Sequence, residues 1–311
     1  MTDNNLANTL ISKVECKQGA VRAVRFNADG NYCLTCGSNK SVRLWNPYTG
    51  ALIKEYCGHG YEVLDADASF DSANLCSGGM DKCVIYWDVA QGKVLRKLRG
   101  HAAQVNCVCF SEEATVIFSG SVDTTVRAWD ARSHSQQPIQ VLEESKDNVT
   151  SLLTTDHEVI TGCLDGRVRR YDLRMGQLNT DCVGNPVTCV NLTRDGQCIL
   201  ASSLDGRLRL LDKDTGEMLN DYSGHVNSKY NLDACISSSD THIFSGSEDG
   251  FIYVWNLIDG KIVTKLHHDT TRAQGVVHSL SHHPTKPCLL TACENKIFLW
   301  KSQSATEETN G

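Results

Sequence analysis

The sequence lacks the segments that mark a secreted or membrane-spanning protein. No apolar run approaches the ~18 residues that would cross a bilayer. Residues 1–10 contain neither the basic region nor the apolar region of a signal peptide. The net charge of −7 argues against general binding to nucleic acids or anionic membranes. We therefore expect a cytoplasmic and nuclear protein with no membrane span.

Motifs of familiar catalytic and metal sites are also missing. The chain has no Gly-x-x-x-x-Gly-Lys-Ser/Thr phosphate loop and no Gly-x-Ser-x-Gly nucleophile elbow. A single Cys-x-x-Cys at 33–36 has no second pair at the spacing of a zinc site. The histidine pairs at 267–268 and 282–283 have no supporting carboxylates, so we interpret them as loop and surface residues. We expect no catalytic residue, no cofactor and no metal.

Cysteine, in contrast, is plentiful, with fifteen residues. Disulfide frameworks stabilise small secreted domains that cannot build a core. This chain has 311 residues, enough to build a core without disulfides. We therefore expect reduced thiols that fill small positions in strands.

One pattern recurs seven times along the chain at intervals of 40 to 45 residues. Each unit closes on an aromatic or apolar residue: Trp45, Trp87, Trp129, Tyr171, Leu211, Trp255 and Trp300. Six positions earlier each unit carries a turn residue: Asn39, Asp81, Asp123, Asp165, Asp205, Asp249 or Glu294. This period with a closing Trp-Asp is typical of a four-stranded propeller blade. The sequence therefore predicts an all-β, seven-bladed β-propeller.

The ring must close, and the two ends of the chain indicate how. The predicted repeats span about 15–57, 58–99, 100–141, 142–182, 183–222, 223–265 and 266–301. The segment after Trp300 is polar and poor in β-branched residues, which makes it a poor fourth strand, whereas residues 9–15 lie before the first unit and are free to supply one. We predict that 9–15 completes the last blade and so covers its edge. Residues 1–8 and 302–311 are expected to be tails, the second of them disordered.

Three units carry His, Ser, Asp and Trp in one register. The sets are His59, Ser77, Asp81 and Trp87; His101, Ser119, Asp123 and Trp129; and His225, Ser245, Asp249 and Trp255. A Ser-His-Asp set can be catalytic, but a catalytic site is usually a single constellation. The repetition favours a buried structural relay that ends on the Trp N–H. In the first unit Asn39 replaces Asp, and Lys17 falls where His is expected.

The residue before the turn Asp is apolar in four consecutive units: Met80, Val122, Leu164 and Leu204. Turns are usually polar, so these side chains predict an apolar docking arc near the channel mouth. Alternatively, they fold under the rim and pack on their own blades. Tyr61 and Glu62, in the loop after a Gly-His pair, complete the candidate protein-binding set.

Arginines concentrate in the fourth and fifth units, at Arg167, Arg169, Arg170, Arg174, Arg194, Arg207 and Arg209. Third strands of other units also carry Arg in this register, for example Arg43 and Arg127. A local contact with RNA or an acidic peptide is the alternative. We expect any RNA contact to be indirect or weak.

Gly58-His59 with Trp87-Asp88, and Gly100-His101 with Trp129-Asp130, resemble the WD-repeat propeller family, and the resemblance covers essentially the whole chain. It implies a non-catalytic scaffold that assembles multiprotein complexes, here as a monomeric subunit. Residues 21–27, 36–40 and 57–63 more narrowly resemble family members that organise the mitogen-activated, extracellular-signal-regulated protein kinase cascade. That resemblance also implies association with the spliceosome in pre-mRNA splicing.

A second resemblance lies at the ends of the third and fourth units. Trp129-Asp130-Ala131-Arg132 and Tyr171-Asp172-Leu173-Arg174 resemble the Trp-Asp-x-Arg ending of substrate receptors of cullin–RING ubiquitin ligases. This resemblance implies an adaptor contact through Arg132 and Arg174. Alternatively, these arginines cap the strand in solvent.

Overall fold

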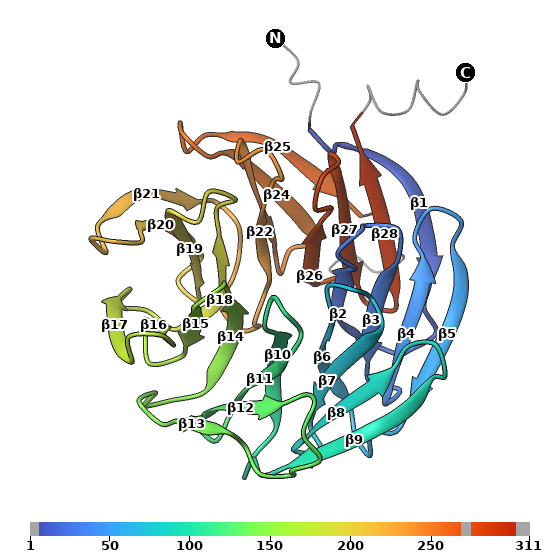
Figure 1. The fold of residues 1–311 in the computed structure, drawn as a ribbon. Helices are drawn as coiled ribbons and strands as arrows, with labels where there is room; N and C mark the ends of the chain where they lie inside the picture. Colours follow the sequence, from blue (N-terminus) through green and yellow to red (C-terminus); the bar gives the residue numbers. More distant parts are fainter. Residues whose placement is uncertain (1–5, 269–274, 303–311) are drawn as a thin grey trace.

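The computed structural model describes residues 6–268 and 275–302. Within these ranges the chain forms seven four-stranded sheets and no helix, so it contains no helix there that could cross a membrane. Figure 1 shows the sheets as blades of a ring around a common centre, with strands β2, β6, β10, β14, β18, β22 and β26 innermost. The predicted all-β, seven-bladed β-propeller is confirmed.

Blades 1 to 3 each use four consecutive strands. Blade 1 contains β2 (Val21–Phe26), β3 (Cys33–Gly37), β4 (Ser41–Asn46) and β5 (Ala51–Cys57). Blade 2 contains β6 (Val63–Ala68), β7 (Asn74–Gly79), β8 (Cys83–Asp88) and β9 (Lys93–Arg99). Blade 3 contains β10 (Val105–Phe110), β11 (Val116–Ser121), β12 (Val126–Asp130) and β13 (Gln140–Leu142).

Blades 4 to 6 repeat the arrangement. Blade 4 contains β14 (Val149–Thr154), β15 (Glu158–Cys163), β16 (Arg167–Asp172) and β17 (Gln177–Cys182). Blade 5 contains β18 (Val187–Leu192), β19 (Cys198–Ser203), β20 (Arg207–Asp212) and β21 (Met218–Ser223). Blade 6 contains β22 (Ala234–Ile236), β23 (His242–Gly246), β24 (Phe251–Asn256) and β25 (Ile262–His267).

Blade 7 joins the two ends of the chain. It contains β26 (Val277–His282), β27 (Cys288–Cys293), β28 (Lys296–Lys301) and β1 (Thr9–Glu15). β1 pairs antiparallel with β28, with Thr9 opposite Lys301 and Glu15 opposite Lys296. The predicted closure by residues 9–15 is confirmed.

The expected terminal tails are described only in part. Leu6 and Ala7, predicted to lie in the first tail, are instead buried in the core between blades 6 and 7. Both side chains are apolar and find a hydrophobic surface next to β1. In the second tail, Ser302 is not disordered as predicted but buried, with its N–H donating to the carbonyl of residue 287, and 303–311 lies outside the described residues.

Each hydrophobic core lies between two neighbouring blades. Between blades 7 and 1, for example, Val24 and Trp45 pack with Leu290 and Leu299. A single blade cannot bury both faces of its sheet, so each stabilises the next. This packing leaves most loops and turns at the two ends of the ring outside the cores between blades.

The strand order defines two faces of the ring. The loops between blades, such as 58–62, and the turns between second and third strands, such as 80–82, form what we call the loop face. The turns between first and second strands, such as 69–73, and between third and fourth, such as 89–92, form the hairpin face. Antiparallel strands alternate direction, which places these two sets of turns at opposite ends.

Candidate protein-docking face

A hydrogen-bond relay fixes the loop face of blade 2. The Trp87 indole N–H donates to Ser77 Oγ, and Ser77 Oγ lies 2.8 Å from His59 Nε2. His59 Nδ1 lies 2.9 Å from the Asp81 carboxylate, which also accepts the Gly60 N–H. Ser77 is fully buried, and its hydroxyl is hydrogen-bonded to both Trp87 and His59. The set therefore holds a loop to a turn and presents no accessible nucleophile.

Blade 3 repeats the relay. Trp129 Nε1 lies 2.9 Å from Ser119 Oγ, and His101 Nε2 lies 2.8 Å from the same oxygen. His101 Nδ1 lies 2.9 Å from Asp123. Burial raises the pKa of Asp123, but the Thr125 hydroxyl, His101 and a backbone N–H outweigh it and lower this pKa to about 2. The charged carboxylate is thus an integral part of the loop face.

Blades 1 and 7 contain related relays that sequence reasoning missed. In blade 1, Trp45 donates to Thr35 Oγ1, which donates to the Gln18 side chain, so Gln18 and not Lys17 takes the histidine position. In blade 7, Trp300 Nε1 donates to Thr291 Oγ1, which lies 2.7 Å from His268 Nε2. A threonine on the neighbouring strand, 10 residues before Trp45 and 9 before Trp300, was the available signal.

The interpretation of the histidine pairs as surface residues is wrong for His268 and His283. Both side chains are buried. His268 contacts the rings of Phe298 and Trp300, and His283 packs on Phe26. Burial lowers the pKa of each to about 4 because it disfavours the charged form.

The relay expected in blade 6 does not form. Neither ring nitrogen of His225 has a hydrogen-bond partner among the described residues. The Tyr253 hydroxyl donates to Asp249 at 2.8 Å, and Trp255 Nε1 donates to the backbone carbonyl of residue 223. Ser245 donates to the carbonyl of residue 246. Tyr253 thus takes the carboxylate that His225 would need.

Blades 4 and 5 replace histidine with arginine. Arg169 Nη2 lies 2.5 Å from Asp165 Oδ2, and Arg209 Nη2 lies 2.5 Å from Asp205 Oδ2. Further ion pairs join Arg170 to Asp181 and Arg207 to Asp221. Much of the arginine concentration is therefore neutralised within the protein.

The predicted apolar residues occupy one register of the loop face. Their backbone N–H groups donate to the preceding loops, from Met80 to Glu62, Val122 to Gln104, Leu164 to Asn148 and Leu204 to Pro186. Met80 is exposed and lines the channel pocket, whereas the other three are half-buried. The exposed part of the arc is therefore concentrated at blade 2.

Tyr61 and Glu62 lie beside Met80 at the junction of blades 1 and 2. Tyr61 is 64% exposed, and Lys40 Nζ lies 5.6 Å from its ring centre. Glu62 Oε2 lies 3.1 Å from Arg22 Nη2. The ion pair joins the two blades, while the Tyr61 ring stays available to a partner.

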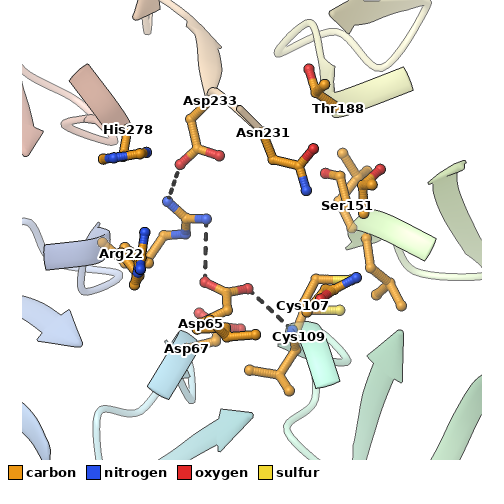
Figure 2. A pocket seen from close by; sticks show the side chains of 18 of the residues that line it. Arg22, Asp65, Asp67, Cys107, Cys109, Ser151, Thr188, Asn231, Asp233 and His278 are labelled. Carbon is orange, nitrogen blue, oxygen red and sulfur yellow. Dashed lines mark hydrogen bonds and ion pairs between the residues drawn. The ribbon is translucent and has the colours of Figure 1, made fainter. Parts of the chain in front are cut away.

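A pocket of about 520 Å³ opens the channel on this face. Figure 2 shows its polar wall, with Arg22, Asp65, Ser151, Asn231 and His278 drawn from different blades around one space. The Tyr230 and His278 rings lie 5.4 Å apart at the wall. Exposed apolar side chains at the rim and polar groups inside suit recognition of a protein segment.

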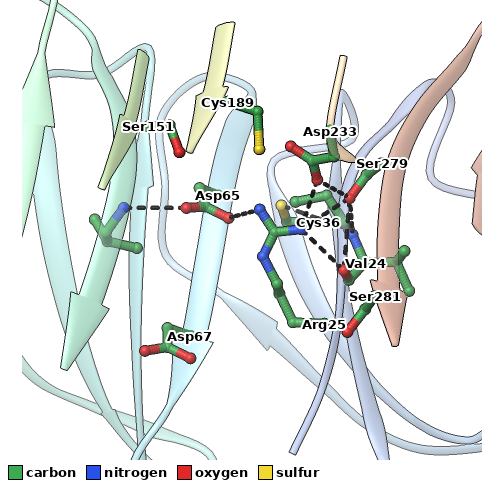
Figure 3. Close-up of polar contacts among 12 residues, drawn as sticks. Val24, Arg25, Cys36, Asp65, Asp67, Ser151, Cys189, Asp233, Ser279 and Ser281 are labelled. Atoms are coloured by element: carbon green, nitrogen blue, oxygen red, sulfur yellow. Dashed lines mark hydrogen bonds and ion pairs between the residues drawn. The ribbon is translucent and has the colours of Figure 1, made fainter. Parts of the chain in front are cut away.

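Arg25 ties four blades together inside the channel (Figure 3). Its Nη2 lies 3.2 Å from Asp65 of blade 2, and its Nη1 lies 2.7 Å from Asp233, just before β22. Nη1 also donates to Ser279 of blade 7 at 2.9 Å. Asp65 in turn accepts the Val108 N–H of blade 3 at 3.1 Å. The pocket floor is therefore rigid.

The channel thiols are poor nucleophiles. Burial raises the pKa of Cys107 and Cys109 well above the ordinary thiol value. Both therefore stay protonated at neutral pH, and the thiolate is the reactive form. All fifteen cysteines are free thiols.

Comparison with known proteins agrees with the repeat and the fold. The family described as "WD domain, G-beta repeat" matches residues 8–46, 50–88, 92–130, 176–212, 216–256 and 260–301. The chain belongs to the WD-repeat family. The WD repeat that closes on Tyr171 lies outside the matched segments, and it is the one in which Tyr replaces Trp and Arg169 replaces histidine.

WD-repeat relatives cover nearly the whole chain. "WD repeat domain-containing protein 83" of Rattus norvegicus is 59% identical over 298 residues, 96% of this chain and 93% of the relative. The protein of that name from Homo sapiens is 58% identical over 298 residues, with the same coverage. The Danio rerio protein is 60% identical over 290 residues, 93% of this chain and 91% of the relative.

Proposed function

We propose that this WD-repeat propeller is a non-catalytic scaffold that docks proteins on its loop face. The observation that carries the proposal is the exposed pair Met80, which lines the channel pocket, and Tyr61, in the adjoining loop that a buried relay fixes. Tyr is enriched among residues that dominate binding energy, and a rigid loop loses little entropy on binding. Different blades would hold different partners and raise their effective concentration for one another.

The partners in this proposal are components of the extracellular-signal-regulated kinase cascade and of the spliceosome. The resemblance of residues 21–27, 36–40 and 57–63 to kinase-cascade organisers supports it. Tyr61 and Glu62 belong to the last of these segments and lie on the loop face. Both kinds of partner place the protein in the cytoplasm and the nucleus, where its fifteen free thiols would persist.

A crosslinking pull-down from cell lysate tests the proposal. We compare the wild type with Tyr61→Ala/Met80→Asp and with Leu164→Asp/Leu204→Asp, after confirming that each variant melts like the wild type. Kinase-cascade and spliceosomal proteins should be lost from the first variant because it removes the exposed anchor. Loss from the second as well would extend the docking arc to blades 4 and 5.

The matched control is Ile258→Asp. Ile258 is 81% exposed but lies in a turn of the hairpin face, so its replacement adds the same charge at the other end of the channel. The Ile258→Asp variant should capture the same proteins as the wild type. Retention of every partner by both loop-face variants would reject the docking face.

The second candidate function is that of a cullin–RING substrate receptor. Arg132 and Arg174 are exposed, and their backbone N–H groups donate to Asp130 and Asp172 at 2.8 Å. These turns hold both guanidinium groups in solvent, where an adaptor could reach them. Arg132→Glu/Arg174→Glu should then abolish capture of ligase components, and unchanged capture would remove this candidate.

A further inference from the structure

The other end of the channel carries a second, chemically different hollow. It has a volume of about 770 Å³ and opens on the hairpin face. Its wall comes from the turns after β2, β6, β10, β14 and β26, so it spans blades 7 and 1 to 4. It adjoins the channel pocket through Asp67, Phe110 and Thr154, which line both.

Carboxylates gather on the blade 3 and blade 4 side of this hollow. Glu112, Glu113 and Asp156 are exposed there, and Asp67 lies deeper. The neighbouring Asp156 side chain raises the pKa of Glu112, and burial adds to the effect. Two carboxyl groups therefore approach each other with no cation between them among the described residues.

The turns of blades 1 to 4 around the hollow supply no compensating charge, whereas the blade 7 turn carries Lys286, which does not line the hollow. Residues 27–32, 69–73, 111–115 and 155–157, which form these turns in blades 1 to 4, contain no Lys or Arg. A bound cation would relieve the repulsion between Glu112 and Asp156. An anionic ligand such as a nucleic acid would instead be repelled.

Aromatic surface lies beside the carboxylates. Phe70, at the tip of the turn after β6, is 76% exposed. Phe26 is half-buried and Phe110 buried in the same wall, and Pro284 is exposed at its edge. An aromatic face next to negative charge suits a guanidinium or ammonium group on an aliphatic stem.

A metal ion fits the hollow poorly. No group of three or more His, Cys, Asp or Glu side chains suited to a metal occurs in residues 6–268 and 275–302. The volume of the hollow is far larger than a single ion, and its aromatic side chains offer no ligand atoms to a metal. The occupant that matches both charge and apolar surface is a polypeptide.

We infer that the hairpin-face hollow binds an arginine- or lysine-bearing segment of a partner protein, with Glu112 and Asp156 holding the cation and Phe70 packing on its stem. The inference rests on the proposed scaffold function and gives it a second docking site of defined chemistry. The loop face recognises its partners through Tyr61 and Met80 at the opposite end. One chain could thus hold two proteins along a single axis.

Fluorescence anisotropy on the purified full chain tests the inference. The probe is a short fluorescein-labelled peptide of alternating arginine and glycine, and a peptide with glutamate in place of arginine is its control. Glu112→Gln/Asp156→Asn should weaken binding of the arginine peptide by roughly five- to thirty-fold, because two ion pairs are lost. Phe70→Ala should weaken it by about two- to five-fold. Added salt should weaken wild-type binding.

The matched control is Asp214→Asn/Glu217→Gln, which removes the same charge from an exposed turn of blade 5 outside the hollow. It should bind like the wild type. Equal affinity of the Glu112/Asp156 variant and the wild type, or equal binding of the glutamate peptide, overturns the inference. Saturable binding of CaCl2 alone, lost in the same variant, also overturns it by reassigning the hollow to a metal. If the double variant fails to fold, Glu112→Gln alone is used.

This experiment is independent of the lysate pull-down. The titration contains only the purified chain and a peptide, so retention of partners by the loop-face variants does not alter its outcome. Peptide binding without loop-face partners would leave the hollow as the docking site. If the loop face captures partners but the purified chain does not bind the arginine peptide, the scaffold proposal stands and the hollow is rejected as a docking site.

Discussion

His59 and His225 occupy the same place in two blades but have opposite surroundings. His59 is bonded on both ring nitrogens, whereas His225 has no partner among the described residues. We predict that His59→Phe lowers the free energy of unfolding by about 1–3 kcal/mol because Ser77 and Asp81 lose a partner. His225→Phe should leave stability unchanged or raise it, because an unsatisfied polar ring is replaced by an apolar one.

Urea unfolding of the two variants measures the difference directly. The pair is matched in chemistry, fold position and burial, so each variant controls the other. Equal losses in both would show that His225 has hydrogen-bond partners in solution.

Arg25 is the residue whose removal should affect the most blades. Arg25→Met leaves Asp65 and Asp233 facing the channel without their shared cation. We predict a loss of roughly 3 kcal/mol in the free energy of unfolding. Adding Asp65→Asn and Asp233→Asn should restore most of it, because the uncompensated charges disappear.

Chemical denaturation of the single and triple variants measures this coupling. A triple variant no more stable than Arg25→Met would show that the arginine stem, and not its charge, supports the channel.

Local pattern decided which site residues could be predicted. The spacing from His59 to Asp81 and Trp87 repeats with His101, so the relays of blades 2 and 3 were readable from the sequence. The ion pair of Arg25 with Asp233 spans 208 residues and depends on ring closure. No periodic pattern contains it. The relay predicted for blade 6 was wrong because the Tyr253 hydroxyl binds the Asp249 carboxylate, a contact that sequence spacing does not reveal.

At the scale of elements, β1 is the strand on which the ring depends. It covers the edge of β28, and the polar segment after Trp300 offers no replacement. We predict that deleting residues 1–14 lowers the melting temperature by on the order of 10 °C or more, because one strand of pairing and the burial of Leu6 and Ala7 are lost.

Differential scanning calorimetry of the deletion measures this effect. Deletion of residues 1–5, which the structure does not describe, is the control and should melt near the wild type. An unchanged melt after the longer deletion would show that blade 7 is stable with three strands.

Strands were predictable where the turn residues agreed with the repeat period. The burial of individual side chains within those strands was less predictable. β1 was readable as the closing strand because the chain end after Trp300 lacks strand-forming residues. The carboxylates Asp65 and Asp67 were not readable as channel groups. They alternate with apolar residues like any half-exposed strand, yet they accept backbone N–H groups of the next blade.

At the scale of the whole molecule, histidine burial makes stability depend on pH. Burial lowers the pKa of His225, His268, His278, His282 and His283 to about 4. In the unfolded chain each titrates near its ordinary value of ~6.5, so between pH 6.5 and 4 the unfolded state binds more protons. Stability should therefore fall as pH falls, by roughly 2 kcal/mol for each fully buried histidine at pH 5.

Thermal melts from pH 7.5 to 4.5 check the sign. Asp65 opposes the trend, since burial raises its pKa to about 6 and protonation favours its folded form. His225→Phe should flatten the curve, because it removes one of the groups that the unfolded state protonates. A melting temperature that rises as pH falls through this range would contradict the assignment.

The bond from Arg25 to Asp233 also bears on synthesis. Its two residues lie 208 positions apart, and β1 pairs with a strand near the other end of the chain. Since synthesis adds ~5–20 residues per second, Asp233 is made about 10–40 s after Arg25. During that interval the exposed Leu10 and Ile11 belong to an unpaired edge. The growing chain is therefore most exposed to aggregation and chaperone capture just before its last blade is made.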